Sequence, residues 1–268
     1  MKEKLRSLLT LTICLFAGTL YAQGGFITMN TGMAAKMSAH PITGFVNVTK
    51  IEINPSIEQI NVSLGEGMNI GGTLGYMVNK NIGFEFGISH LFGGKTNAQE
   101  WETSGTFNSS FSSSMTRFNP GFIIASGFKK INPYAKFGII LGSGEINYGV
   151  KQVKDGDIML LNLQLNGGTA FGLSTSVGAL FSMNRSMSFF AEITSNNLSY
   201  SPTRGAYTVV TYNETDILSQ LTVKEKEIEF VNSYEPKNYR NDSMPTLALK
   251  ERYPFGSLGL NLGLKYGF

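Results

Sequence analysis

Five charged residues whose neighbours are mostly apolar are the first candidates for chemistry: Glu85, Arg117, Lys136, Glu192 and Lys265. Two carboxylates in an enclosed site are what a glycosidase needs, because one acts as the acid and the other as the base or nucleophile. That chemistry also requires room for a sugar beside the carboxylates. If the five charges share a narrow interior, we expect them to pair with one another instead.

The two histidines do not suggest a second kind of catalysis. His90 directly follows Ser89, and His40 precedes Pro41. An acyl-transfer site needs a serine and a histidine in hydrogen-bond contact, whereas adjacent residues of a strand point to opposite faces. We therefore expect His90 to lie at a membrane interface. Two scattered histidines do not make a zinc site, and no catalytic, metal or cofactor site is expected.

The element that positions these residues is clearest at the end of the chain. Leu258, Leu260, Leu262, Leu264, Tyr266 and Phe268 alternate with the small or polar residues Ser257, Gly259, Asn261, Gly263, Lys265 and Gly267. This period of two predicts a strand with one apolar and one polar face. Its length is sufficient for a tilted crossing of a membrane.

Seven more segments with the same alternation precede it, at about 26–35, 70–78, 82–92, 114–127, 132–146, 167–182 and 186–200. Short turns near residues 79–81, 128–131 and 183–185 join six of them into hairpins. Four connections are long, about 36–66, 93–113, 147–165 and 202–253, and we expect irregular loops there. Short turns at one end and long loops at the other predict an eight-stranded, up-and-down, transmembrane antiparallel β-barrel, with periplasmic turns and extracellular loops.

The barrel explains the five charged residues. Four of them take inward positions between outward apolar neighbours, and Arg117 is inward if Phe118 and Phe122 face lipid. A charge facing lipid would be costly. We expect Glu85, Arg117, Lys136, Glu192 and Lys265 to form an ion network in the lumen. The alternative is that they line a small pore.

The first 22 residues are typical of a secretory signal peptide, with Lys2, Lys4 and Arg6 before an apolar stretch at 8–20. Cleavage is expected between Ala22 and Gln23, leaving residues 23–268 as a single barrel domain. The leader contains the only cysteine, and its three basic and one acidic residues reduce the net charge from +3 to about +1 when removed. A nearly neutral chain is not expected to bind nucleic acid.

Three stretches carry a resemblance to a known group: residues 132–138 (NPYAKFG), 188–193 (SFFAEI) and 257–263 (SLGLNLG). With the leader and the hairpins, they resemble the small outer-membrane barrels of Gram-negative bacteria, the OmpA/OmpX-like superfamily, and more specifically its porin-family "outer membrane beta-barrel" proteins. The resemblance implies the fold and a place in the cell outer membrane, but no shared activity. The final strand, with Leu264, Tyr266 and Phe268, is similar to the signal read by the barrel-assembly machinery.

The resemblance implies outer-membrane lipid or lipopolysaccharide and the barrel-assembly machinery as partners, with a monomeric barrel expected. The leading hypothesis is a non-enzymatic protein that stabilises the envelope or binds an extracellular ligand through its long loops. A small pore or transporter for solutes is the main alternative. A lipid A-modifying envelope enzyme is the third.

Overall fold

The computed structural model describes residues 24–37, 40–48, 56–102, 105–235 and 241–268. The expected signal peptide and its cleavage position between Ala22 and Gln23 lie outside these ranges. Among the described residues, no helix combines the length and the apolar character needed to cross a membrane.

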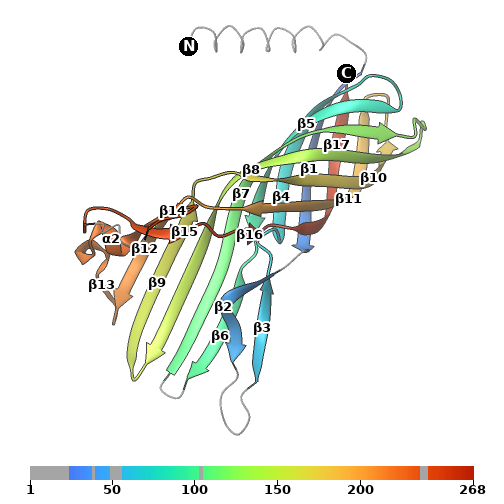
Figure 1. The fold of residues 1–268 in the computed structure, drawn as a ribbon. Helices are drawn as coiled ribbons and strands as arrows, with labels where there is room; N and C mark the ends of the chain where they lie inside the picture. Colours follow the sequence, from blue (N-terminus) through green and yellow to red (C-terminus); the bar gives the residue numbers. More distant parts are fainter. Residues whose placement is uncertain (1–23, 38–39, 49–55, 103–104, 236–240) are drawn as a thin grey trace, which may run out of the picture.

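Eight strands form a closed ring in which each pairs antiparallel with both neighbours. In ring order they are β1 (Gly25–Lys36), β4 (Gly67–Met77), β5 (Ile82–Gly93), β7 (Gly105–Ala125), β8 (Ile131–Lys154), β10 (Ala170–Ser182), β11 (Met187–Tyr200) and β17 (Ser257–Gly267). The first and last strands close the ring, in register from Phe26 opposite Gly267 to Lys36 opposite Ser257. The expected eight-stranded antiparallel barrel is confirmed, and its ring is visible in Figure 1.

The two faces of the ring strands differ as the alternation predicts. On the outside, Met29 and Val177 are 74% and 68% exposed, whereas inward Thr28 and Ser176 are 5% and 7% exposed. A soluble protein rarely exposes so continuous an apolar surface, but a barrel in lipid requires one.

Three short turns gather at one end of the barrel and are built by asparagine side chains. Asn79 accepts hydrogen bonds from the backbone N–H groups of Asn81 and Ile82 (2.8 and 2.9 Å). Asn184 does the same for Ser186 and Met187 (2.9 and 2.7 Å). Such side-chain caps substitute for backbone pairing and allow tight reversals.

The four long connections are not irregular, contrary to the expectation from sequence. They contain β2 (His40–Val48), β3 (Ile57–Val62), β6 (Thr96–Glu102), β9 (Asp157–Asn166), β12 (Arg204–Tyr212), β13 (Thr215–Asp216), β14 (Glu227–Val231), β15 (Thr246–Leu249) and β16 (Tyr253–Pro254). The fourth connection also has two short helices, η1 (Leu218–Gln220) and α2 (Val223–Lys226).

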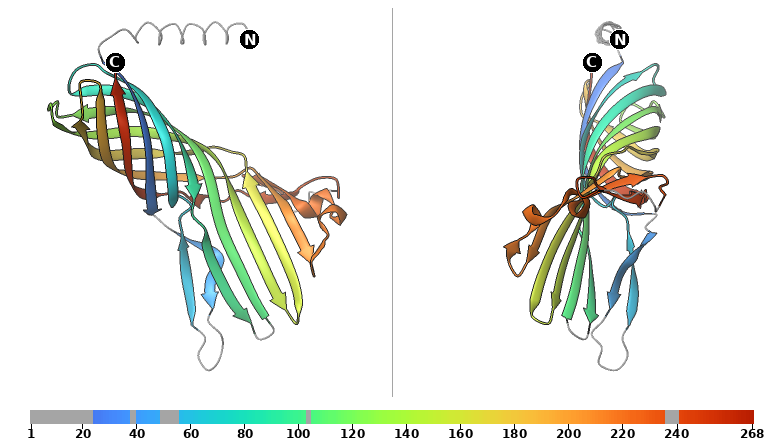
Figure 2. Two further views of the ribbon diagram at one scale, coloured as in Figure 1. Left: turned by 180° about the vertical axis from the view of Figure 1, so that it is seen from behind. Right: turned by 60° about the vertical axis from the view of Figure 1, so that its left-hand side comes forward.

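Most of these strands join a sheet that projects beyond the ring, which we call the projecting sheet (Figures 1 and 2). Strands β7 and β8, with 21 and 24 residues, belong to both the ring and this sheet. At about 3.4 Å per residue they extend roughly 70–80 Å, more than twice the thickness of a bilayer core. Beyond the ring, the backbone N–H and C=O groups of these two strands would be unpaired. Segments of the long connections form hydrogen bonds with them and so become strands.

Candidate functional site

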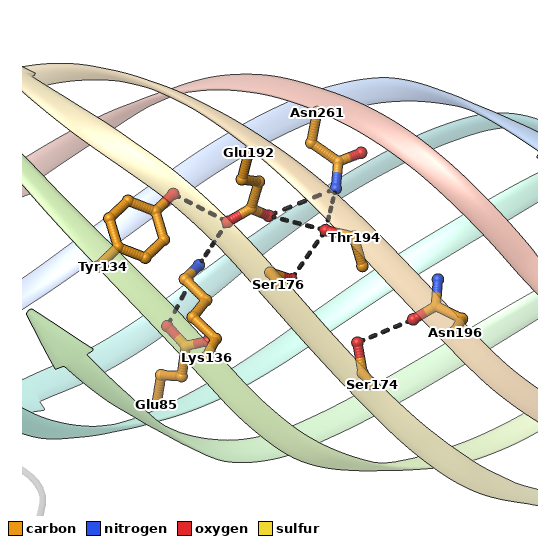
Figure 3. A network of polar contacts seen from close by, with 9 residues as sticks. All are labelled: Glu85, Tyr134, Lys136, Ser174, Ser176, Glu192, Thr194, Asn196 and Asn261. Atoms are coloured by element: carbon orange, nitrogen blue, oxygen red, sulfur yellow. Dashed lines mark hydrogen bonds and ion pairs between the residues drawn. The ribbon is translucent and has the colours of Figure 1, made fainter.

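Three of the five predicted lumen charges meet inside the barrel (Figure 3). The Lys136 Nζ lies 3.1 Å from Glu192 Oε2 and 3.4 Å from Glu85 Oε2. The three side chains come from β8, β11 and β5 and are 5–14% exposed. A lysine shared by two enclosed carboxylates is a charged cluster with a net charge of −1.

Glu192 is the better supported of the two acids. The Tyr134 hydroxyl donates to its Oε2 at 2.9 Å, and the Asn261 amide donates to its Oε1 at 3.3 Å. The Thr194 hydroxyl accepts from Asn261 at 3.0 Å and lies 2.8 Å from Ser176. These hydrogen bonds continue the cluster into a polar layer across β8, β10, β11 and β17 (Figure 3).

Lys265 and Arg117, the other two predicted residues, do not join this cluster. Lys265 Nζ sits 3.7 Å from the centre of the Phe26 ring, a cation–π contact. Arg117 donates a hydrogen bond to the Asn69 side chain. Neither has an acidic partner within ion-pair distance among the described residues.

Apolar side chains close both ends of this polar layer. Near the short turns, Ile123, Tyr134, Leu180 and Phe190 pack together. At the other end, a larger cluster forms where the ring opens into the projecting sheet, and it includes Leu91, Met115, Ile140, Leu198, Tyr200 and Phe255. Tyr200 is fully buried, and its hydroxyl lies 2.6 and 2.5 Å from the carbonyl oxygens of Gly144 and Gly167.

The space left between the two clusters is small. The polar cavity that includes Glu85, Lys136, Glu192 and Arg117 has a volume of about 100 Å³. Small-molecule sites generally measure about 300–1,000 Å³. A glycosidase arrangement of Glu85 and Glu192 therefore has no room for its sugar, and both carboxylates are occupied by Lys136.

The serine and histidine considered for acyl transfer lie on opposite faces of β5. Ser89 lines the interior cavity. His90 contacts the Thr116 hydroxyl through Nδ1 at 3.0 Å and packs edge-on against the Phe92 ring at 4.5 Å. The two side chains point to opposite faces, as adjacent strand residues must.

The projecting sheet carries an open cleft of about 600 Å³ that sequence reasoning did not identify. Across its floor, Asn97, Ser110, Gly149 and Asn162 lie opposite one another on β6, β7, β8 and β9. Gln99, Asn108 and Lys151 form the row beside them. The only sequence signal was the Ser-, Asn- and Thr-rich composition of residues 96–114, because which strands would pair was unknown.

Residues 29–230 match the family described as "Outer membrane protein beta-barrel domain", which covers three quarters of the chain. The search of curated protein sequences returned no match to the chain.

Among solved structures, Neisserial surface protein A is similar to the chain at 11% identity and a TM-score of 0.37, covering 91% of this chain and 97% of that one. The attachment invasion locus protein Ail of Yersinia pestis is similar at 10% identity and a TM-score of 0.35, covering 92% and 99%. These likenesses are too weak to support an argument of their own, so the assignment depends on the family match. By that match, the chain belongs to the outer membrane protein beta-barrel domain family.

Proposed function

We propose that the protein is a non-enzymatic integral barrel of the outer membrane, crossing it with eight strands, and that it binds polar ligands on other surfaces through its projecting sheet. The family places it at the outer membrane. The observation that carries the rest is the open cleft with amide and hydroxyl side chains across its floor, on strands that continue beyond the ring, while the lumen is filled.

The chemistry of the cleft favours a ligand rich in hydroxyl or amide groups, such as a glycan. Asn97, Asn108 and Asn162 each offer both donors and acceptors. Gly149 leaves the middle of the floor open, because it has no side chain. A ligand can bind such side chains directly or through a bridging water, since water-mediated hydrogen bonds are nearly as favourable as direct ones.

The contents of the lumen argue against the alternative of a pore. A permeating solute would have to pass two packed apolar clusters and the Lys136 ion pairs between them. Breaking a buried ion pair is costly, and a solute that crosses the lumen would have to break these. The third alternative, a lipid A-modifying enzyme, lacks a serine–histidine contact at positions 89 and 90.

Insertion into the membrane would be guided by the outward face of the last strand. Leu264, Tyr266 and Phe268 are 48%, 50% and 39% exposed on the outside of the ring. The Phe268 backbone N–H donates to the Gly25 carbonyl at 2.9 Å, which ties this strand to β1. We propose that these three side chains are read by the barrel-assembly machinery and then face lipid or lipopolysaccharide, with the barrel acting as a monomer.

A glycan array probed with the purified protein in detergent micelles would test the binding function. We compare the unaltered chain with Gly149→Leu, whose new side chain would stand on the cleft floor. Its Cβ would meet only the ends of the Asn162 and Ser110 side chains, at 2.9 and 3.0 Å. The matched control is Asn147→Leu, which adds the same side chain to the same face of β8 outside the cleft. We expect Gly149→Leu to lose at least tenfold in affinity and the control to retain it. Equal binding by both variants, or no binding by the unaltered protein, would refute the proposal.

A further inference from the structure

Arg117 is a buried cation with no counter-charge in the described part of the chain. Its side chain comes from β7 and is 3% exposed. Its terminal nitrogen donates to Asn69, and its Nε has no hydrogen-bond partner among the residues that the structure describes. No described carboxylate lies within ion-pair distance. Burial of an unpaired charge is among the costliest arrangements in a folded protein.

The other lumen charges do not neutralise it. Glu85 and Glu192 are balanced by Lys136, which bonds both, and by Lys265, which lines a neighbouring small cavity with Glu85 and Lys136. Glu85 pairs across the ladder with Gly121, four residues along β7 from Arg117. That separation is about 13 Å along a strand. The interior therefore has an excess positive charge, concentrated at Arg117.

The surroundings of Arg117 suit a small anion. Arg117 lines the cavity of about 100 Å³, which is enough for a halide-sized ion and several water molecules. Around it the cavity is lined by uncharged polar side chains, among them Asn30, Ser89 and Asn119. Hydroxyl and amide N–H groups donate to anions, and the carboxylates in the lining belong to the Lys136 cluster.

We propose that the lumen binds one small monovalent inorganic anion of chloride size against the Arg117 guanidinium. The ion supplies the missing counter-charge and hydrogen-bond acceptor, and it is taken up when the barrel closes. Binding to the folded state alone lowers the unfolding rate, because the ion must be released before the ring opens.

Refolding from urea into detergent micelles, in sodium bromide or in sodium gluconate at equal ionic strength, tests this site. Gluconate is too bulky for the cavity. After exhaustive dialysis into gluconate, we expect one bromide per folded protein by X-ray fluorescence and a bromine anomalous peak beside Arg117. The unfolding rate should be at least tenfold lower for protein refolded in bromide.

Two variants separate the site from general salt effects. Arg117→Gln keeps a donor near Asn69 but removes the charge, and it should retain no bromide and unfold at the same rate in both salts. Lys129→Gln removes an exposed cation of the short turn between β7 and β8 and should behave as the unaltered protein does. If Arg117→Gln does not fold, the bromide count of the unaltered protein still decides the matter. Absence of bound bromide there, or bromide retained by folded Arg117→Gln, would overturn the proposal.

Discussion

Replacing Lys136 with methionine should be the most destabilising single change within the ion cluster. Methionine keeps much of the length of the side chain and its apolar stem but removes the charge. Glu85 and Glu192 would then stand together in a buried site without a cation in ion-pair contact, since Lys136 is the residue that joins them. Removing one partner of a buried pair costs about 3–5 kcal/mol. The unfolding equilibrium should shift by roughly two to three and a half powers of ten.

The two acids should respond unequally. Glu85→Gln leaves Lys136 paired with Glu192 in a neutral pair, so we expect a loss of only about 1 kcal/mol. Glu192→Gln should cost more, because Tyr134 and Asn261 also donate to that carboxylate. The triple variant with Lys136→Met, Glu85→Gln and Glu192→Gln should recover most of the stability lost in Lys136→Met, since buried charge clusters are often replaceable by neutral groups.

The assay is equilibrium urea unfolding in lipid vesicles, followed by far-ultraviolet circular dichroism, with the denaturant slope checked for each variant. An unchanged slope shows that the variants differ in stability and not in the compactness of either state. The reasoning would be refuted if Glu85→Gln destabilised the barrel as much as Lys136→Met. It would also fail if the triple variant were no more stable than the lysine variant alone.

Three further predictions concern assembly, packing and transport. Phe268→Ser should lower outer-membrane assembly severalfold, whereas Lys265→Ala on the inward face should not. Membrane fractionation of cells that express each variant would measure the amount assembled, and equal yields of the two would contradict the prediction. Gly75→Val should destabilise the barrel by about 1–3 kcal/mol, because a Cβ there would overlap the buried Phe26 ring. If the variant were as stable in urea as the unaltered chain, the lumen would be less tightly packed than this. In planar bilayers we expect no conductance at any voltage, and reproducible single-channel steps would favour the pore instead.

The barrel itself could be predicted from local pattern. A period of two with apolar outward residues is a property of each segment, and it holds wherever that segment lies in the ring. Tight turns such as Asn79 to Asn81 are equally local, because the asparagine side chain caps its own reversal. The closure of the chain into eight antiparallel strands therefore followed from sequence alone.

The inward direction of Glu85, Arg117, Lys136, Glu192 and Lys265 was also determined by alternation. Alternation assigns a residue to a face but not to a height along the barrel. Height depends on the register between strands, which non-local pairing decides. The register brings Lys136 to both acids. Arg117 lies four residues along β7 from Gly121, which pairs with Glu85, so Arg117 is beside Asn69 and not beside the acids.

The projecting sheet was decided by tertiary structure in the same way. Residues 96–114 have the polar composition of a surface loop, and nothing in their order requires a strand. They pair because β7 continues past the ring, where its backbone N–H and C=O groups need partners. Strand β6 pairs with one edge of β7 and β8 with the other. Sequence thus determined which side chains face lipid and which face inward, while strand register and edge pairing decided which charges meet and where a polar cleft forms.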